Sequence, residues 1–169
     1  MRRHLATKAY GTPLFAVLLL SVAAGTAVSS PLPLAVPEFT FSDTSGEARD
    51  QRAEHEARLR VLVERLRSDL AASGKFRIVD IACDPRPCAA DVGRSLEQAR
   101  KAGARFVVLV TVHKTSSLIL SCPVHVIDTG SGKLVFGRLH SFRGDTDEAW
   151  QRAGRFLARE LIGELADKQ

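Results

Sequence analysis

Residues 106–112 read Phe-Val-Val-Leu-Val-Thr-Val, and this stretch decides the fold. Both alternating sets of positions in it are apolar or β-branched, which predicts a strand buried on both faces at the centre of a sheet. A helical pattern over residues 89–102 precedes it and ends at Gly103. The residues of that helix that are expected to face inward are Val92, Leu96 and Ala99.

Two strand–helix–strand units are predicted on the amino-terminal side of this stretch. Residues 76–81 are expected to form a strand ahead of the 89–102 helix, and residues 38–42 to form an earlier one. The helix between these two strands is predicted to run from the capping box Thr44-Ser45-Gly46-Glu47 to about Ala72. Connections of these lengths join parallel strands, so parallel pairing is expected.

The segments after the central strand predict an antiparallel meander and a closing helix. Strands are expected over residues 118–128 and 134–142, joined by a glycine-bearing hairpin turn at 129–133. The final helix follows Asp145 and Glu148, which have capping-box spacing. Its inward stripe is Trp150, Ala153, Leu157, Leu161 and Leu165. The predicted order is βαβαβββα, an α/β (α+β) fold with a mixed five-stranded sheet and three helices packed on it.

The amino terminus has the pattern of a secretory signal peptide. Residues 1–8 carry three basic side chains and no acidic one, and residues 14–24 are apolar. Gly25 and Ala27 then form a small-x-small cleavage site. We expect residues 1–27 to be removed, which predicts a periplasmic or secreted protein. The alternative is an uncleaved signal that holds the chain at the membrane.

The mature chain is predicted to begin with a spacer. Pro31, Pro33 and Pro37 stiffen residues 28–37, which favours an extended proline-rich lead-in. Residues 38–169 are then expected to form a single α/β domain, long enough to bury an adequate core.

The charge balance argues against nucleic-acid binding. The chain has 24 lysines and arginines against 19 aspartates and glutamates, a net charge of +5. Three of the basic residues lie in the predicted signal, which leaves 21 against 19, or +2, for the mature chain. Basic and acidic residues alternate on the predicted helices, whereas nucleic-acid binding needs a basic stripe. Membrane contact is expected only through an uncleaved signal.

The three cysteines divide into a pair and a single residue. In an oxidising compartment Cys83 and Cys88 are predicted to form a disulfide, because Asp84-Pro85-Arg86-Pro87 makes a stiff turn between them. Unpaired thiols and a redox pair are the alternatives, and the Cys-x4-Cys spacing disfavours the redox pair. Cys122 lies in an apolar strand and is expected to be a buried thiol, with an intermolecular bridge as the alternative.

Three histidines, His113, His125 and His140, lie on consecutive predicted strands. With a two-residue turn at Thr115-Ser116, His113 and Cys122 are expected to share one face of the sheet, and His125 to lie on the other. A metal site of His113, His140 and Cys122 would need a register that the sequence does not establish, and no short ligand spacing supports it. No metal is therefore expected.

Arg143, Asp145, Asp147 and Trp150 surround the start of the closing helix. Acids at this position cap free amides and complement the helix dipole, so capping is favoured over calcium binding. Arg143 is expected to pair with one of the acids or with the strand end, and Trp150 to anchor the core. These four residues are the candidate interaction residues.

Sequence motifs of catalysis are missing. No nucleophile elbow, His-Glu-x-x-His motif or evident carboxylate pair is present. The stretch Gly130-Ser131-Gly132-Lys133 lacks the other residues of a phosphate loop. The sequence therefore predicts no catalytic residue, no cofactor and no enzymatic activity.

Three stretches carry a resemblance to a known family. They are residues 103–108 (Gly-Ala-Arg-Phe-Val-Val), 128–133 (Asp-Thr-Gly-Ser-Gly-Lys) and 143–150 (Arg-Gly-Asp-Thr-Asp-Glu-Ala-Trp). They are similar to the secreted bacterial proteins grouped as domain of unknown function 2380, roughly from Phe39 to Leu161. The topology also resembles the amino-terminal domain of the Tol-system periplasmic protein and related outer-envelope assembly proteins.

This resemblance implies a periplasmic, non-enzymatic domain that binds other envelope proteins, and it supplies no catalytic residue. We therefore expect a protein-interaction or assembly module. The alternative is a periplasmic small-ligand or metal-binding carrier.

Overall fold

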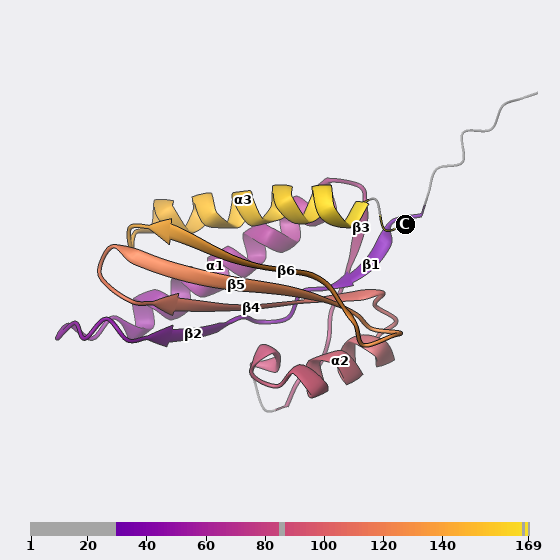
Figure 1. The fold of residues 1–169 in the computed structure, drawn as a ribbon, viewed down its shortest axis with the longest axis horizontal. Helices are drawn as coiled ribbons and strands as arrows, with labels where there is room; N and C mark the ends of the chain where they lie inside the picture. The colour runs from indigo at the N-terminus through magenta and orange to yellow at the C-terminus, as the bar shows by residue number, and fades with distance from the viewer. Residues whose placement is uncertain (1–29, 85–86, 167, 169) are drawn as a thin grey trace, which may run out of the picture.

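The computed structural model describes residues 30–84, 87–166 and 168. The predicted signal peptide lies outside them. The described residues form a mixed sheet with α1 and α3 on one face and α2 on the other (Figure 1). The strands are β1 (Leu32–Ala35), β2 (Thr40–Asp43), β3 (Phe76–Val79), β4 (Phe106–Lys114), β5 (Ile119–Asp128) and β6 (Leu134–Arg143). The helices are α1 (Arg52–Ala72), α2 (Val92–Lys101) and α3 (Asp147–Ala166), and a 3₁₀ turn, η1 (Cys88–Ala90), precedes α2.

The strand order is β3-β1-β4-β5-β6, and β2 also pairs with β4. Both β1 and β2 run parallel to β4, β1 beside its beginning (Leu34↔Phe106) and β2 beside its end (Thr40↔Thr111). Two short strands thus share one position in the sheet. Pro37 lies between them and has no amide hydrogen to donate to the ladder. The predicted fold class is confirmed, and the sheet has six strands rather than five because this position is divided.

The spacer prediction is wrong for residues 32–35. They form β1, which pairs with β3 on one side and β4 on the other, and Leu34 and Ala35 are completely buried. Prolines usually mark an edge strand or no strand, and they hid this strand from the sequence pattern. Pro33 has no amide hydrogen, but its carbonyl still accepts a hydrogen bond from the Arg105 amide (2.7 Å).

Helix α1 begins at Arg52, later than the predicted capping box. The two capping-box residues bind Lys114 at the end of β4 instead. The Thr44 hydroxyl donates to the Lys114 carbonyl (3.3 Å), and Glu47 pairs with the Lys114 ammonium (2.9 Å). A tertiary contact therefore replaces the expected local cap.

Helix α2 is shorter than predicted because its first turn is the separate 3₁₀ turn. Asp91 caps it by accepting a hydrogen bond from the Arg94 amide (3.0 Å). Ala99 is buried as expected, but Val92 is 52% exposed. Val92 is the first residue of α2, whose buried side contains Ser95 and Ala99, so the inward prediction for Val92 is wrong.

The core lies on both sides of β4, as its continuous apolar sequence predicted. On one face α1 and α3 pack over the sheet, and the two helices approach closely at Gly154, where an added Cβ would lie 3.7 Å from Leu62. On the other face α2 covers only a smaller cluster around Val107 and Leu109. The predicted stripe of α3 is confirmed, with Trp150, Leu157, Leu161 and Leu165 each at most 2% exposed.

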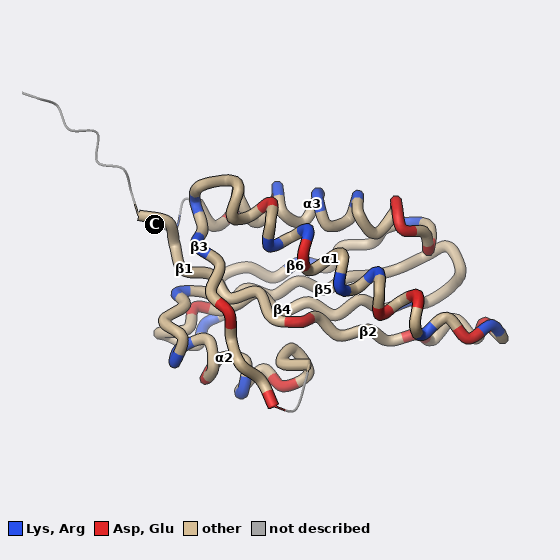
Figure 2. Tube along the Cα trace, turned by 180° about the vertical axis from the view of Figure 1, so that it is seen from behind, with Lys and Arg blue, Asp and Glu red and all other residues tan. Residues whose placement is uncertain are grey.

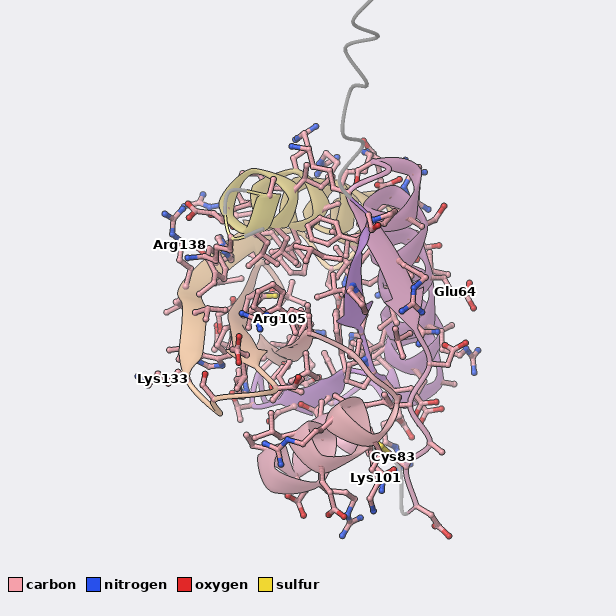
Figure 3. All side chains as sticks on the ribbon, turned by 90° about the vertical axis from the view of Figure 1, so that its right-hand side faces the viewer. Glu64, Cys83, Lys101, Arg105, Lys133 and Arg138 are labelled. Carbon is pink, nitrogen blue, oxygen red and sulfur yellow. A yellow bond between two sulfur atoms is a disulfide. The ribbon has the colours of Figure 1, made fainter. Side chains whose placement is uncertain are left out.

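The two edges of the sheet differ. The β3 edge has four residues, whereas the β6 edge has ten. No strand pairs with the outer side of β6 in the described part of the chain. Figure 3 shows this edge beneath α3, with Arg138 on its outer side. The long free edge of β6 and helix α3 above it form one continuous surface.

Candidate functional site

A groove lies between β6 and α3. It has a volume of about 480 Å³. The small side chains of Ala149 and Ala153 on α3 line this space above the strand. The lining residues are Cys122, Leu139, His140, Ser141, Phe142, Arg143, Ala149, Arg152, Ala153, Phe156 and Leu157.

Two large apolar side chains are exposed beside the groove. Leu139 on β6 is 72% exposed, and Phe156 on α3 is 48% exposed. The Phe156 ring contacts the His140 ring edge to face, with centroids 5.5 Å apart. An exposed aromatic ring that contacts another ring at the mouth of a groove is typical of a binding surface rather than a core.

The acidic residues next to the groove are engaged in ion pairs. Glu160 pairs with Arg138 (2.6 Å), and its other carboxylate oxygen lies 2.7 Å from His140 Nε2. Arg138 also pairs with Glu164 (2.9 Å), and Glu148 pairs with Arg152 (2.6 Å). These carboxylates are therefore already partly neutralised by the chain itself.

Several arginines on this surface have no such partner. Arg143, Arg155 and Arg159 form no ion pair with any other described residue. Figure 2 shows the basic segments along the outer side of α3. The expected pairing of Arg143 with an acid of the closing helix is absent from the described residues. The alternation of charges in the sequence thus conceals a predominantly basic outer side of α3.

A buried polar cluster closes one end of this surface, and Asp145 is at its centre. Asp145 Oδ2 lies 2.7 Å from His55 Nε2 and 2.8 Å from Lys114 Nζ. Asp145 Oδ1 accepts hydrogen bonds from Arg58 Nη1 (2.9 Å) and Trp150 Nε1 (3.1 Å). The carboxylate is thereby held from α1, β4 and α3 at once.

The cluster keeps its charges. Burial raises the pKa of the Asp145 carboxyl, but hydrogen bonds from His55, Lys114 and Trp150 outweigh burial and hold that pKa well below its ordinary range. Burial lowers the pKa of the Lys114 ammonium, yet its hydrogen bonds with Asp145 and Glu47 outweigh burial and raise it. The cluster is a structural clamp on the turn between β6 and α3, because the side chains around Asp145 all bind its carboxylate.

The four candidate interaction residues separate into two groups. Arg143 lines the groove and Asp147 is exposed, where it accepts a hydrogen bond from Arg58 (2.8 Å). Trp150 is buried and the Asp145 side chain is only 9% exposed, so neither side chain is open to a partner. Asp145 also does not cap α3; the Thr146 hydroxyl accepts the bond from the Ala149 amide (3.3 Å) instead. Sequence reasoning missed the cluster because its members are distant in sequence.

The expected arrangement of the histidines is wrong. His113 pairs with Ser121, whereas Cys122 pairs with His140, so His113 lies on the opposite face from Cys122 and His140. His125 shares the face of His113. Within residues 30–84, 87–166 and 168, no group of three histidine, cysteine, aspartate or glutamate side chains is arranged to hold a metal ion.

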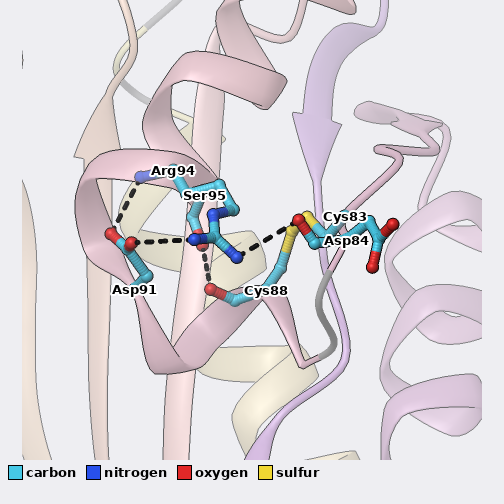
Figure 4. The surroundings of a disulfide bond; sticks show 6 residues. All are labelled: Cys83, Asp84, Cys88, Asp91, Arg94 and Ser95. Atoms are coloured by element: carbon cyan, nitrogen blue, oxygen red, sulfur yellow. Dashed lines mark hydrogen bonds and ion pairs between the residues drawn. A yellow bond between two sulfur atoms is a disulfide. The ribbon is translucent and has the colours of Figure 1, made fainter.

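The structure contains a disulfide between Cys83 and Cys88, with Cα atoms 5.4 Å apart (Figure 4). Around it, the Ser95 hydroxyl donates to the Cys88 carbonyl (2.7 Å) and Arg94 donates to the Asp84 carbonyl (3.3 Å). The bridge therefore attaches the loop after β3 to η1, and the two hydrogen bonds attach both to α2. Cys122 is buried and free, and burial raises the pKa of its thiol to about 12.

Among the described segments, no helix has both the length and the apolar character needed to cross a membrane.

Comparison with known proteins shows the fold. The hypothetical protein CT253 from Chlamydia trachomatis has a TM-score of 0.57 at 15% identity, over 80% of this chain and 99% of that one. TolB from Acinetobacter baumannii has a TM-score of 0.52 at 14% identity, over 81% of this chain but only 29% of TolB. The PelC dodecamer from Paraburkholderia phytofirmans has a TM-score of 0.52 at 16% identity, over 84% of this chain and 92% of PelC.

A search of curated protein sequences found no match. A family model matches residues 33–162, which is most of the chain and includes all three stretches on which the resemblance rests. The expected likeness to TolB is also confirmed at the level of the fold. The chain belongs to the family described as protein of unknown function (DUF2380).

Proposed function

We propose that this chain is a non-enzymatic interaction module of the bacterial cell envelope, which docks another envelope protein along the outer edge of β6 and the adjoining groove. The resemblance to the Tol-system domain supports this function, and the shared fold with TolB is consistent with it. The signal pattern of residues 1–27 supports export to the periplasm.

The free edge of β6 is the observation that carries the proposal. It is a ten-residue strand whose outer side has no partner strand within the described residues. Edge strands present unpaired amide and carbonyl groups, and an extended segment of another protein satisfies them by adding a strand. Natural proteins usually protect such an edge, whereas here Leu139 lies exposed on it.

Side chains beside the edge add specificity to that backbone pairing. The groove above β6 has apolar walls at Ala153 and Leu157, and the exposed Phe156 ring stands at its mouth. A pocket beside a sheet edge accepts alternate side chains of an added strand. The clamp around Asp145 holds the turn after β6, so the groove has a fixed shape without a bound partner.

Site-specific photo-crosslinking tests the proposal. A photoreactive amino acid replaces Leu139 on the edge or, as the matched control, Val92 on α2, which is also exposed (72% and 52%). We expect a discrete adduct with one envelope protein from position 139 and none from position 92. Adducts from both positions alike, or from neither, would contradict the proposed docking edge.

A further inference from the structure

We infer that the segment docked on β6 is extended and acidic, with a large apolar side chain that enters the groove between β6 and α3. This inference rests on the proposed function and specifies the chemistry of the partner. It follows from the charge balance of the surface, from the shape and polarity of the groove, and from the direction of side chains in an added strand.

The surface around the groove has an excess of positive charge. Arg143 and Arg152 line the groove, and no aspartate or glutamate among the described residues does. The neighbouring charged residues with ion pairs are Arg138, Glu148, Glu160 and Glu164. All three glutamates are already paired with arginine or histidine of the same surface. The unpaired charge that the described residues bring to the groove is therefore that of Arg143, and guanidinium groups attract carboxylates and bind them in a planar, two-pronged geometry.

The floor of the groove is apolar and uncharged. Cys122 and Leu157 are each 2% exposed, and burial of the Cys122 thiol keeps it protonated. Ala149 and Ala153 leave a volume of about 480 Å³ above this floor. Such a space accepts a large apolar side chain, whereas a carboxylate placed on this floor would lose its hydration without a hydrogen-bond donor.

An added strand would meet both features at once. Alternate side chains of a strand point to opposite sides, so one set faces α3 while the other lies beside Leu139. Arg152, on α3, and Arg143, at the end of β6, line the same groove. A segment that alternates acidic and apolar residues would place an apolar side chain in the groove and its carboxylates on the Leu139 side of the sheet, where Arg143 shares the face of Leu139 on β6.

Charge disfavours a second copy of this chain as the occupant. A two-fold contact between two β6 edges brings each patch against the same patch of the other copy. The unpaired arginines of both copies would then lie in one interface, where like charges repel. An acidic segment has the opposite sign and removes this repulsion.

Peptide binding to the full mature chain tests the inference. The probe is a fluorescein-labelled ten-residue peptide that alternates glutamate and valine around a central phenylalanine, and its matched control has lysine at each glutamate. We expect fluorescence anisotropy to show at least about tenfold tighter binding of the acidic peptide, weakening as salt is added because screening reduces the attraction.

Matched charge reversals locate the site. Arg143→Glu should weaken binding of the acidic peptide about tenfold, whereas Arg60→Glu, on the exposed side of α1, should change it less than about twofold. Ala153→Met should weaken binding by filling the groove. Circular dichroism checks that each variant is folded, and a misfolded Ala153→Met is replaced by the smaller Ala153→Val, for which a weaker loss is expected.

The inference is overturned if both peptides bind equally, if Arg143→Glu has no effect, or if the acidic peptide does not bind. It is also overturned if the chain binds only vesicles of phosphatidylethanolamine with phosphatidylglycerol, or if it dimerises through β6. An adduct at position 139 with a partner lacking an acidic segment would overturn the inference alone and leave the proposed function standing.

Discussion

The ammonium group of Lys114, the last residue of β4, lies 2.8 Å from the carboxylate of Asp145, in the turn before α3. Lys114 is only 1% exposed, and Asp145 also accepts bonds from His55, Arg58 and Trp150. This pair joins the central strand to the segment that connects β6 with α3. It therefore fixes the end of the groove on which the proposed function depends.

Removal of the Asp145 charge should strongly destabilise the fold. Asp145→Asn leaves the buried Lys114 ammonium with fewer counter-charges, and loss of one partner of a buried pair costs roughly 3–5 kcal/mol. Urea unfolding followed by tryptophan fluorescence measures the change, since Trp150 is the single tryptophan and contacts Asp145. The matched control is Asp147→Asn, whose side chain is 79% exposed. That variant should lose less than about 1 kcal/mol.

Acid should unfold the chain through the same carboxylate. The pKa of Asp145 is lower in the folded chain than its ordinary value of 3.8, so the unfolded chain binds more protons as the pH falls. The stabilisation is complete above the ordinary pKa and is lost as the pH falls toward the depressed one. We expect the free energy of unfolding to decrease below about pH 4. Urea titrations over a pH series should show a shallower decrease in Asp145→Asn; an unchanged slope would assign the acid sensitivity to other groups.

The disulfide should contribute modestly to stability. Replacement of both Cys83 and Cys88 by serine opens a short loop, for which chain entropy predicts a loss of about 2 kcal/mol. The comparison of urea midpoints between the double variant and the unaltered chain measures it. Without reductant, native chains should show no rapid thiol labelling, because Cys122 is buried with its pKa raised to about 12. Rapid labelling of two or more thiols would mean that the bridge is absent.

The contact between α1 and α3 requires a small residue at Gly154. An added Cβ would lie 3.7 Å from both a methyl group and the carbonyl of Leu62, so alanine fits but leucine does not. Gly154→Leu should destabilise the chain by about 1–3 kcal/mol through overpacking. Gly163→Leu, on the same helix with no neighbour within 4 Å, is the control. It should be neutral or stabilising by up to about 1 kcal/mol, because leucine favours helix more than glycine does.

Local patterns predicted most of the elements and part of the groove. The hairpin of β5 and β6, the stripe of α3 and the burial of β4 follow from alternation, helical periodicity and turn residues within short segments. Arg143 was singled out and lies in the groove. The sequence did not single out Phe156. This residue lies outside the apolar stripe of α3 and is 48% exposed, and its contact with His140 of β6 depends on the tertiary structure.

Sequence alone determined the fold class, the family and the order of β4, β5, β6 and α3, because each depends on periodicity or motifs within a contiguous stretch. Tertiary structure alone decided that β1 lies between β3 and β4, that Cys122 and His113 face opposite sides, and that Asp145 is buried against Lys114. The physical reason is that strand position, register and buried ion pairs depend on contacts between segments that are distant in sequence. A local sequence pattern does not determine the free energies of such contacts.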